Sequence, residues 1–116
     1  MLKDGRNLSD ITEWMCEKFA IESKIVPVTD NSVETRITSG GKDLHLQEFW
    51  VKNRGNGEIE GIQYIGAEKA RPLPSAINAI QDSELVIIAP GNPLTSIGPM
   101  LSIKSFRKEY TAHAYI

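Results

Sequence analysis

The segment that follows residue 84 carries the residue types best suited to hold a phosphate-bearing ligand. The apolar run Leu85–Ala89 is typical of a parallel strand that is buried on both faces, and Ala89–Pro99 reads as a glycine-proline turn that leads into a helix. A strand, a turn and a helix in this order place free backbone N–H groups at the carboxyl edge of a sheet. The order therefore predicts an anion-binding site at this edge.

Individual residues of the turn support this interpretation. We expect Gly91 to let a ligand approach the backbone and to tolerate a positive φ, and Asn92–Pro93 to form a turn whose amide faces a base or a phosphate. Pro99 would lie in the first turn of the helix, where its missing N–H costs nothing. The alternative is a purely structural strand-to-helix turn, because the segment is neither a Walker loop nor G-x-G-x-x-G.

The start of the following helix is predicted from the same stretch. We expect the side chain of Thr95 or Ser96 to cap it, which leaves the N–H groups of Ile97 and Gly98 facing the crevice. Such a cluster of N–H groups at a helix N-terminus forms a nest for an anion.

A second polar and aromatic cluster lies within residues 45–54. His45, Gln47, Trp50 and Arg54 are suited to stack on a base and to pair with a phosphate. The alternative is the solvated face of a hairpin with one aromatic side chain in the core.

The sequence shows no catalytic triad and no metal-binding spacing. His45 has no Ser or Cys partner at a recognisable distance along the chain, and neither H-E-x-x-H nor paired C-x-x-C occurs. Cys16 reads as a structural thiol, and His113 as uninvolved. Asp30, Asp43 and Glu48 are isolated carboxylates. If the chain takes part in catalysis, we expect it to supply binding and positioning.

Periodicity predicts the elements that position these residues. Helices are expected from about Ser9 to Phe19 and after Pro72 and Pro74, the second with an inner face of apolar residues. The predicted strands are Lys24–Val28, Val33–Ile37, the hairpin arm Leu44–Val51, Glu58–Ile65 and Leu85–Ala89. A helix followed directly by a continuous apolar strand indicates an α/β fold.

Composition narrows the function classes. Of the 116 residues, 41% are hydrophobic and 24% charged, which is ordinary for a globular domain, and the net charge of −2 does not favour nucleic-acid binding. No apolar run is long enough to cross a membrane. A single cysteine rules out a disulfide framework within the chain and suits the reducing cytoplasm.

The stretch from Pro90 to Leu101 resembles the signature G-P-S-N-P-[VI]-T-S-I-G-P-[IL]-L of the 2-phospho-L-lactate transferases of coenzyme F-420 biosynthesis. Three other stretches resemble motifs of that family in order and spacing, namely Ile25–Arg36, Leu44–Gly55 and Gly66–Pro72. The opening residues, Leu2–Gly5 with Leu8 and Ser9, also match, so that the likeness covers about residues 1–108.

The resemblance implies an α/β Rossmann-like core with an added β-hairpin subdomain, in a protein that is usually a homodimer. It implies transfer of a 2-phospholactyl or phosphoenolpyruvyl group from a guanosine diphosphate-linked donor to the deazaflavin Fo, with release of GMP and the help of Mg²⁺. The nucleotide would contact Pro90, Gly91, Asn92, Pro93 and Ser96. Weaker candidates for the same pocket are Gln47, Trp50 and Arg54.

The chain also departs from the family pattern. Ala89 replaces a glycine and Gly91 replaces a serine, and the second change is shared with related regulators that bind UDP-sugars. A non-enzymatic nucleotide-sugar-binding module therefore stays as the alternative, although Asn92–Pro93 favours the transferase. The family's N-terminal glycine-rich loop, its metal ligands and its C-terminal part have no counterpart in residues 1–116. We expect a single partial domain that is inactive alone.

Overall fold

The computed structural model describes residues 4–113 as an α/β arrangement of five α-helices, a π-helical turn and a three-stranded antiparallel sheet. The α/β prediction is confirmed at this level, while the Rossmann-like core stays a prediction. The elements in chain order are α1 (Leu8–Lys18), β1 (Glu34–Ser39), β2 (Lys42–His45), α2 (Leu46–Val51), β3 (Gly61–Ile65), α3 (Pro74–Gln81), η2 (Pro93–Ile97), α4 (Gly98–Ser102) and α5 (Lys104–His113).

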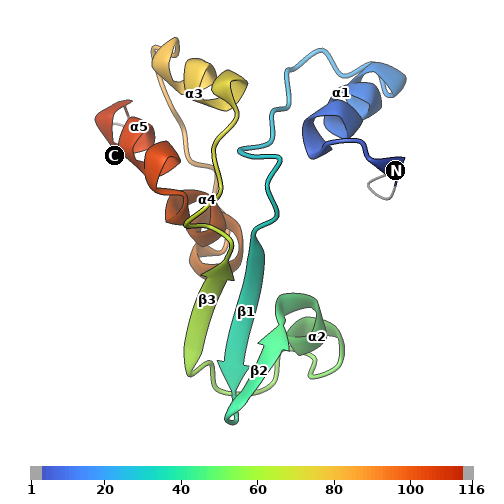
Figure 1. Ribbon diagram of the computed structural model, residues 1–116, viewed down its shortest axis with the longest axis vertical. Helices are drawn as coiled ribbons and strands as arrows, with labels where there is room; N and C mark the ends of the chain where they lie inside the picture. The colour runs from blue at the N-terminus through green and yellow to red at the C-terminus, as the bar shows by residue number, and fades with distance from the viewer. Residues whose placement is uncertain (1–3, 114–116) are drawn as a thin grey trace.

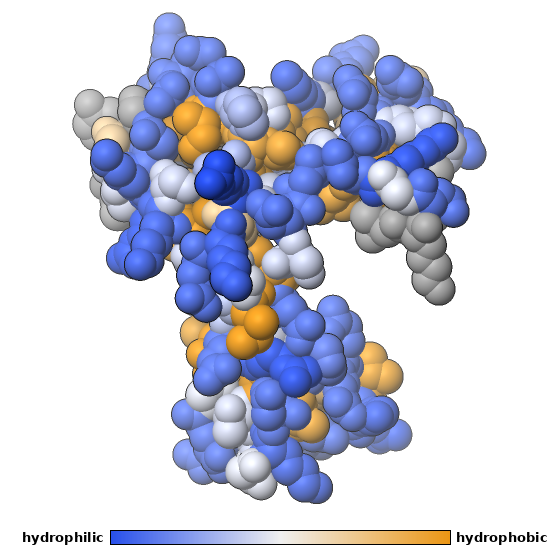
Figure 2. All heavy atoms as spheres, in the orientation of Figure 1, coloured by the Kyte–Doolittle hydropathy of each residue, from blue (hydrophilic) through white to orange (hydrophobic). Residues whose placement is uncertain are grey.

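The described elements form two lobes, which Figure 1 shows one above the other. The sheet and α2 make up the sheet lobe, and α3, α4 and α5 make up the helical lobe. Helix α1 stands apart at the N-terminal end and is joined to the sheet by a long extended segment. Figure 2 shows hydrophobic surface gathered over the helical lobe, whereas the visible face of the sheet lobe is mainly hydrophilic.

Helix α1 confirms the first predicted helix to within one residue at each end. Its start is tied to the loop before the sheet, because the backbone N–H and the hydroxyl of Ser9 donate to the two carboxylate oxygens of Asp30 at 2.8 and 2.7 Å. The apolar stripe of this helix is largely uncovered, with Phe19 65% exposed just beyond its end. These two hydrogen bonds therefore tie the first turn of α1 to the loop before the sheet.

The predicted strand Lys24–Val28 is wrong, since the segment is extended but pairs with no strand of the described chain. A single backbone bond ties its end to another part of the molecule, from the N–H of Leu73 to the carbonyl of Val28 at 2.7 Å. One bond does not make a ladder, and Pro27 has no N–H to extend it.

Strand β1 lies at the centre of the sheet, between β2 and β3. Ile37 pairs with Leu44 on one side and Ile62 on the other, and its side chain is fully buried. Gly40 and Gly41 close the β1–β2 hairpin with φ of 57° and 68°, the left-handed pair that a two-residue type I′ turn requires. The predicted strand 33–37 is confirmed as β1, and β3 is shorter than the predicted 58–65.

The second hairpin arm, predicted as Leu44–Val51, is wrong beyond His45, because residues 46–51 form helix α2. Leu46, Phe49 and Trp50 fall at i, i+3 and i+4, the spacing of one helical face, and only 1% of Phe49 is exposed. The break in strand alternation near Glu48 marks this change to helical spacing.

Burial of Leu85–Ala89 within a sheet is also wrong for the described chain. This segment runs from the end of α3 to η2 without strand pairing, and Leu85 and Ile87 are 63% and 78% exposed. Backbone hydrogen bonds define a strand only when a neighbour supplies the other half of the ladder. All strands of the described residues lie within residues 34–65, so this segment has no neighbour.

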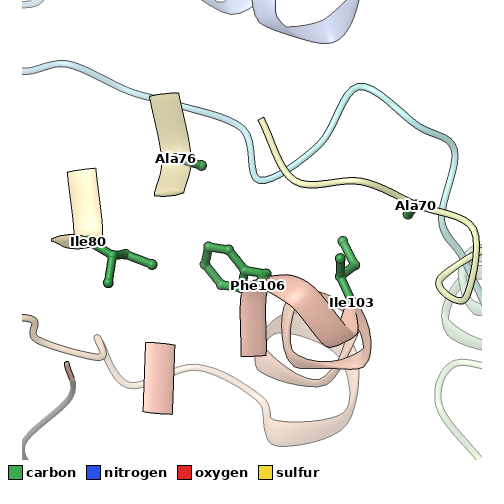
Figure 3. Close-up of a cluster of buried hydrophobic side chains, with 5 residues drawn as sticks. All are labelled: Ala70, Ala76, Ile80, Ile103 and Phe106. Atoms are coloured by element: carbon green, nitrogen blue, oxygen red, sulfur yellow. The ribbon is translucent and has the colours of Figure 1, made fainter. Parts of the chain in front are cut away.

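The core of the helical lobe joins α3 to α5 and to the loop that precedes α3. Figure 3 shows Phe106 of α5 lying between Ile80 of α3 and Ile103, with Ala70 and Ala76 completing the buried cluster. Pro74 occupies the first turn of α3, as predicted, and Ala76 and Ile80 confirm its predicted inner face. This core holds together α3 and α5, which also contribute walls to the candidate site.

Candidate functional site

The turn at residues 92–97 is organised by one side chain. The Oδ1 atom of Asn92 accepts hydrogen bonds from the N–H groups of Leu94 and Thr95 at 2.9 and 3.1 Å. The carbonyl of Asn92 accepts from Ser96 and Ile97 at 2.9 and 3.2 Å. The predicted cap, Thr95 or Ser96, is therefore wrong, because an asparagine side chain reaches the N–H groups two and three residues ahead of it.

The predicted nest of free N–H groups is also absent from this turn. The N–H of Ile97 bonds to Asn92, and the N–H of Gly98 bonds to the carbonyl of Pro93. Gly91 does not use the positive φ that a glycine tolerates, and Pro99 lies in the first turn of α4 as expected. An anion cannot use the N–H groups of residues 94–98 unless the turn opens.

Removal of the Asn92 cap gives the first testable prediction. We expect Asn92→Ala to lower the free energy of unfolding by about 0.5–2 kcal/mol, because two N–H groups lose their acceptor. Urea denaturation followed by circular dichroism measures the change. Asn92→Asp keeps the acceptor oxygen and serves as the control; equal losses in the two variants would contradict a capping role.

A groove of about 470 Å³ lies beside the turn, between the 86–91 segment and the three helices of the helical lobe. It brings together three predicted site residues, Pro90, Gly91 and Ser96. Asn92 and Pro93 adjoin them in the turn. None of the residues that line the groove carries a charged side chain, and its walls include Ile80, Val86, Met100, Leu101, Phe106 and Tyr110.

The other three predicted site residues lie elsewhere, in the sheet lobe. Gln47 and Trp50 belong to α2, which packs against β1 and β2, and Arg54 lies in the turn beyond it with a φ of 52°. Trp50 is 51% exposed and its ring lies against Gly55, where an added Cβ would come within 2.5 Å of a ring carbon. The structure does not bring this group to the groove.

The charged residues near α2 are engaged with one another. The Nδ1 atom of His45 lies 2.9 Å from a carboxylate oxygen of Glu34, and Arg36 bridges Glu34 and Asp43 at 3.3 and 3.1 Å. Half of the His45 side chain is exposed. These contacts form an open ion-pair cluster on the sheet face, and none of its four members is a Ser or Cys nucleophile. Such surface pairs contribute little to stability.

Within residues 4–113, no group of three or more His, Cys, Asp or Glu side chains is placed to hold a metal ion. None of the helices of this part of the chain is long and apolar enough to span a membrane. Cys16 is a free, partly buried thiol of α1. Leu2 and Lys3 of the opening match, and the residues after His113, lie outside the described part, as does the side chain of His113.

Tyr64 is a residue that sequence reasoning missed. It lies in β3, yet its hydroxyl donates to the carbonyl of Leu94 in the turn at 2.6 Å. Burial raises the pKa of Tyr64 above its ordinary value of 10.0. A tyrosine within an alternating strand gives no signal of a contact thirty residues further along the chain.

The raised pKa of Tyr64 predicts a pH dependence. Because the folded state favours the protonated phenol, its contribution to stability is fully present below pH 10.0 and is lost as the pH rises through the higher folded pKa. We expect the free energy of unfolding to fall more steeply above pH 10 in the wild type than in Tyr64→Phe. Parallel denaturation curves for the two proteins at alkaline pH would contradict this assignment.

Comparison with known proteins places the chain in a family. A model of the family described as 2-phospho-L-lactate transferase CofD matches residues 1–114. The 2-phospho-L-lactate transferase of Methanocaldococcus jannaschii is 40% identical over 111 residues, which are 92% of this chain and 36% of that protein. The enzyme of the same name from Methanopyrus kandleri is 39% identical, over 92% of this chain and 34% of that protein.

A relative with a different name is similar to a comparable degree. The phosphoenolpyruvate transferase of Nocardia farcinica is 36% identical over 114 residues, which are 92% of this chain and 34% of that protein. The chain thus spans about a third of the length of the curated relatives it matches. Because the family model extends over nearly all of its residues, the chain belongs to the 2-phospho-L-lactate transferase CofD family.

Proposed function

We propose that this chain is the part of a 2-phospho-L-lactate transferase that holds the nucleotide of a guanosine diphosphate-linked donor. The observation that carries the proposal is the family match over residues 1–114, which includes the turn and the groove beside it. The proposal also includes the Rossmann-like core and the homodimer that the resemblance implies for the full-length protein. Both belong to the whole transferase, of which this chain spans about a third.

The proposed reaction is a displacement at phosphorus. The terminal ribityl hydroxyl of Fo attacks the phosphorus that carries the lactate or enolpyruvate group, and a new P–O bond forms. The bond from this phosphorus to the bridging oxygen breaks, GMP leaves with that oxygen, and the hydroxyl proton passes to a base or to water. Such reactions depend mainly on positioning and on neutralisation of charge.

The groove suits the uncharged part of the nucleotide. Its lining is apolar apart from the backbone, the Ser96 hydroxyl and the Tyr110 hydroxyl, and the Tyr110 hydroxyl is buried without a partner among the described residues. Such a surface favours a base or a ribose over a diphosphate, since charged groups lose more on leaving water. We therefore propose that Pro90, Gly91 and Ser96 contact the nucleoside end of the donor.

Mg²⁺ belongs to the proposal only through the family resemblance. Among residues 4–113, no three His, Cys, Asp or Glu side chains converge on a metal position. We assign no step of the reaction to a metal held by this part of the chain. Gln47, Trp50 and Arg54 stay proposed as a second contact region, with Arg54 as its positive charge.

Two transferred groups are proposed, 2-phospholactyl and phosphoenolpyruvyl. Relatives named 2-phospho-L-lactate transferase and relatives named phosphoenolpyruvate transferase match this chain at 33–40% identity. The two groups differ by two hydrogens next to the carboxylate, at the end of the donor far from guanosine. A groove that holds the nucleoside end does not discriminate between them.

Calorimetry with GDP and with a UDP-sugar tests the proposal. We expect the chain to bind GDP in preference, and we expect Ser96→Ala to weaken binding about fivefold to tenfold through loss of one hydrogen bond. Ser105→Ala is the matched control, because Ser105 is exposed on α5 and does not line the groove. A preference for the UDP-sugar would favour the regulator-like alternative, and absence of GDP binding would contradict the proposed nucleotide site.

A further inference from the structure

The contact between Tyr64 and the turn links the two lobes at the edge of the candidate site. Tyr64 pairs with Thr35 within the sheet, and it is partly buried. Its hydroxyl reaches out of the sheet lobe to the carbonyl of Leu94, the second residue of η2, at 2.6 Å. In Figure 1 the end of β3 lies directly below α4, which continues from η2.

The main chain offers no donor to the carbonyl of Leu94, and the local sequence explains why. In an α-helix it would accept from the N–H of Gly98, but that N–H donates to Pro93 instead, as π-helical winding requires. The next N–H along a π-helix would be at position 99, which is a proline and has none. Tyr64 therefore supplies the hydrogen bond that the main chain cannot give to this carbonyl.

Gly98 allows the tyrosine to come so close. A Cβ atom at position 98 would overlap the Tyr64 hydroxyl and would lie 2.8 Å from the carbonyl oxygen of Pro93. The hydroxyl and the backbone of the turn thus fill the space that a side chain would take. This close packing restricts movement of the turn relative to β3.

We propose that Tyr64 is a positioning residue for the turn at residues 92–97. Its hydrogen bond holds this turn in the π-helical register that places Ser96 at the groove. Without the Tyr64 hydroxyl, the Leu94 carbonyl has no donor and competes with the Pro93 carbonyl for the single N–H of Gly98, so the π-helical turn opens more readily. Ser96 would then move relative to the groove wall. The identity of the ligand in this inference rests on the proposed function, whereas the control of the turn does not.

The test compares Tyr64→Phe with a control variant that is destabilised elsewhere in the same sheet. Ile37→Val removes one methylene from the fully buried centre of β1 and does not touch the turn. Two quantities are measured on the full chain: hydrogen exchange of the amides of residues 95–98 without ligand, and the affinity for GDP. We expect Tyr64→Phe to speed exchange at these amides and to weaken GDP binding, each about tenfold, and Ile37→Val to change neither selectively.

The two measurements distinguish control of the turn by Tyr64 from binding of the nucleotide. Unchanged exchange at residues 95–98 in Tyr64→Phe would overturn the inference, whatever happens to GDP. Faster exchange with unchanged GDP affinity would also overturn it, since the turn would then move without consequence for the ligand. If the wild-type chain does not bind GDP, the proposed function fails, and selective exchange in Tyr64→Phe still supports the control of the turn by Tyr64.

Discussion

Replacing Phe49 with alanine is expected to destabilise the sheet lobe by about 3–5 kcal/mol, the usual cost of removing a fully buried aromatic side chain. Only 1% of Phe49 is exposed, and its ring packs edge-on against Trp50 with centroids 5.9 Å apart. Phe49 is the buried residue of α2, which packs on β1 and β2. Without this side chain, α2 loses the buried contact that packs it against the sheet.

A matched variant on the same helix separates burial from helix formation. Val51 is 77% exposed, so Val51→Ala removes side-chain atoms of the same helix without opening the core, and alanine favours helices. We expect its free energy of unfolding to stay within about 0.5 kcal/mol of the wild type. Urea denaturation followed by circular dichroism and by tryptophan fluorescence measures both variants. Similar losses in the two would contradict the assignment of Phe49 to the core.

Gly98→Ala carries the second large expected effect. The new methyl group would overlap the Tyr64 hydroxyl and press on the carbonyl of Pro93, and overpacking of this kind costs about 1–3 kcal/mol. Because the tyrosine must move, its hydrogen bond to Leu94 is lost as well. We therefore expect a loss at the upper end of this range in chemical denaturation, together with faster amide exchange in η2.

Gly91→Ala is the matched control for this substitution. Its new Cβ would meet Ser96 at 3.4 Å, which is close to ordinary van der Waals contact, and Gly91 does not use a positive φ. We expect a stability equal to the wild type or higher by about 0.4–1 kcal/mol, because alanine restricts the unfolded chain more than glycine does. A strongly destabilised Gly91→Ala would show that the turn is tighter than its contacts indicate.

Phe49→Ala and Gly98→Ala, each with its control, test the separate roles of the sheet lobe and of the turn. Phe49→Ala tests whether the sheet lobe is a stable support, and Gly98→Ala tests whether that support determines the shape of the turn. Loss of GDP binding in Gly98→Ala, with native circular dichroism retained, would agree with Tyr64 acting on the site through the turn. The groove walls that come from α3 and α5 are expected to survive both changes, whereas Ser96 and Ile97 belong to the turn that Gly98→Ala disturbs.

Short-range sequence patterns were sufficient to predict several of the helices and turns. Helix α1, helix α3 with Pro74 in its first turn, and the Gly40–Gly41 hairpin all follow from interactions within a few residues of the chain. A helix bonds to itself, and a two-residue turn needs only backbone angles that glycine permits, so local sequence determines both. The motif matches around Pro90–Leu101 likewise identified the family before any fold was known.

Other features depended on neighbours that no local pattern reveals. The apolar run Leu85–Ala89 has the composition of a buried strand, but a strand exists only beside another strand, and none within residues 4–113 reaches it. Residues 46–51 have both strand-like and helix-like apolar spacing, and the burial of Phe49 against the sheet decided for the helix.

At the candidate site too, some features follow from the local sequence and others only from tertiary packing. The sequence by itself determined the family and the residues of the turn, since both depend on the order of residue types along the chain. Only the tertiary structure decided that Asn92 caps the turn, that Gln47, Trp50 and Arg54 lie away from the groove, and that Tyr64 holds the turn in register. The physical reason is that a hydrogen bond between residues thirty positions apart depends on how two lobes pack.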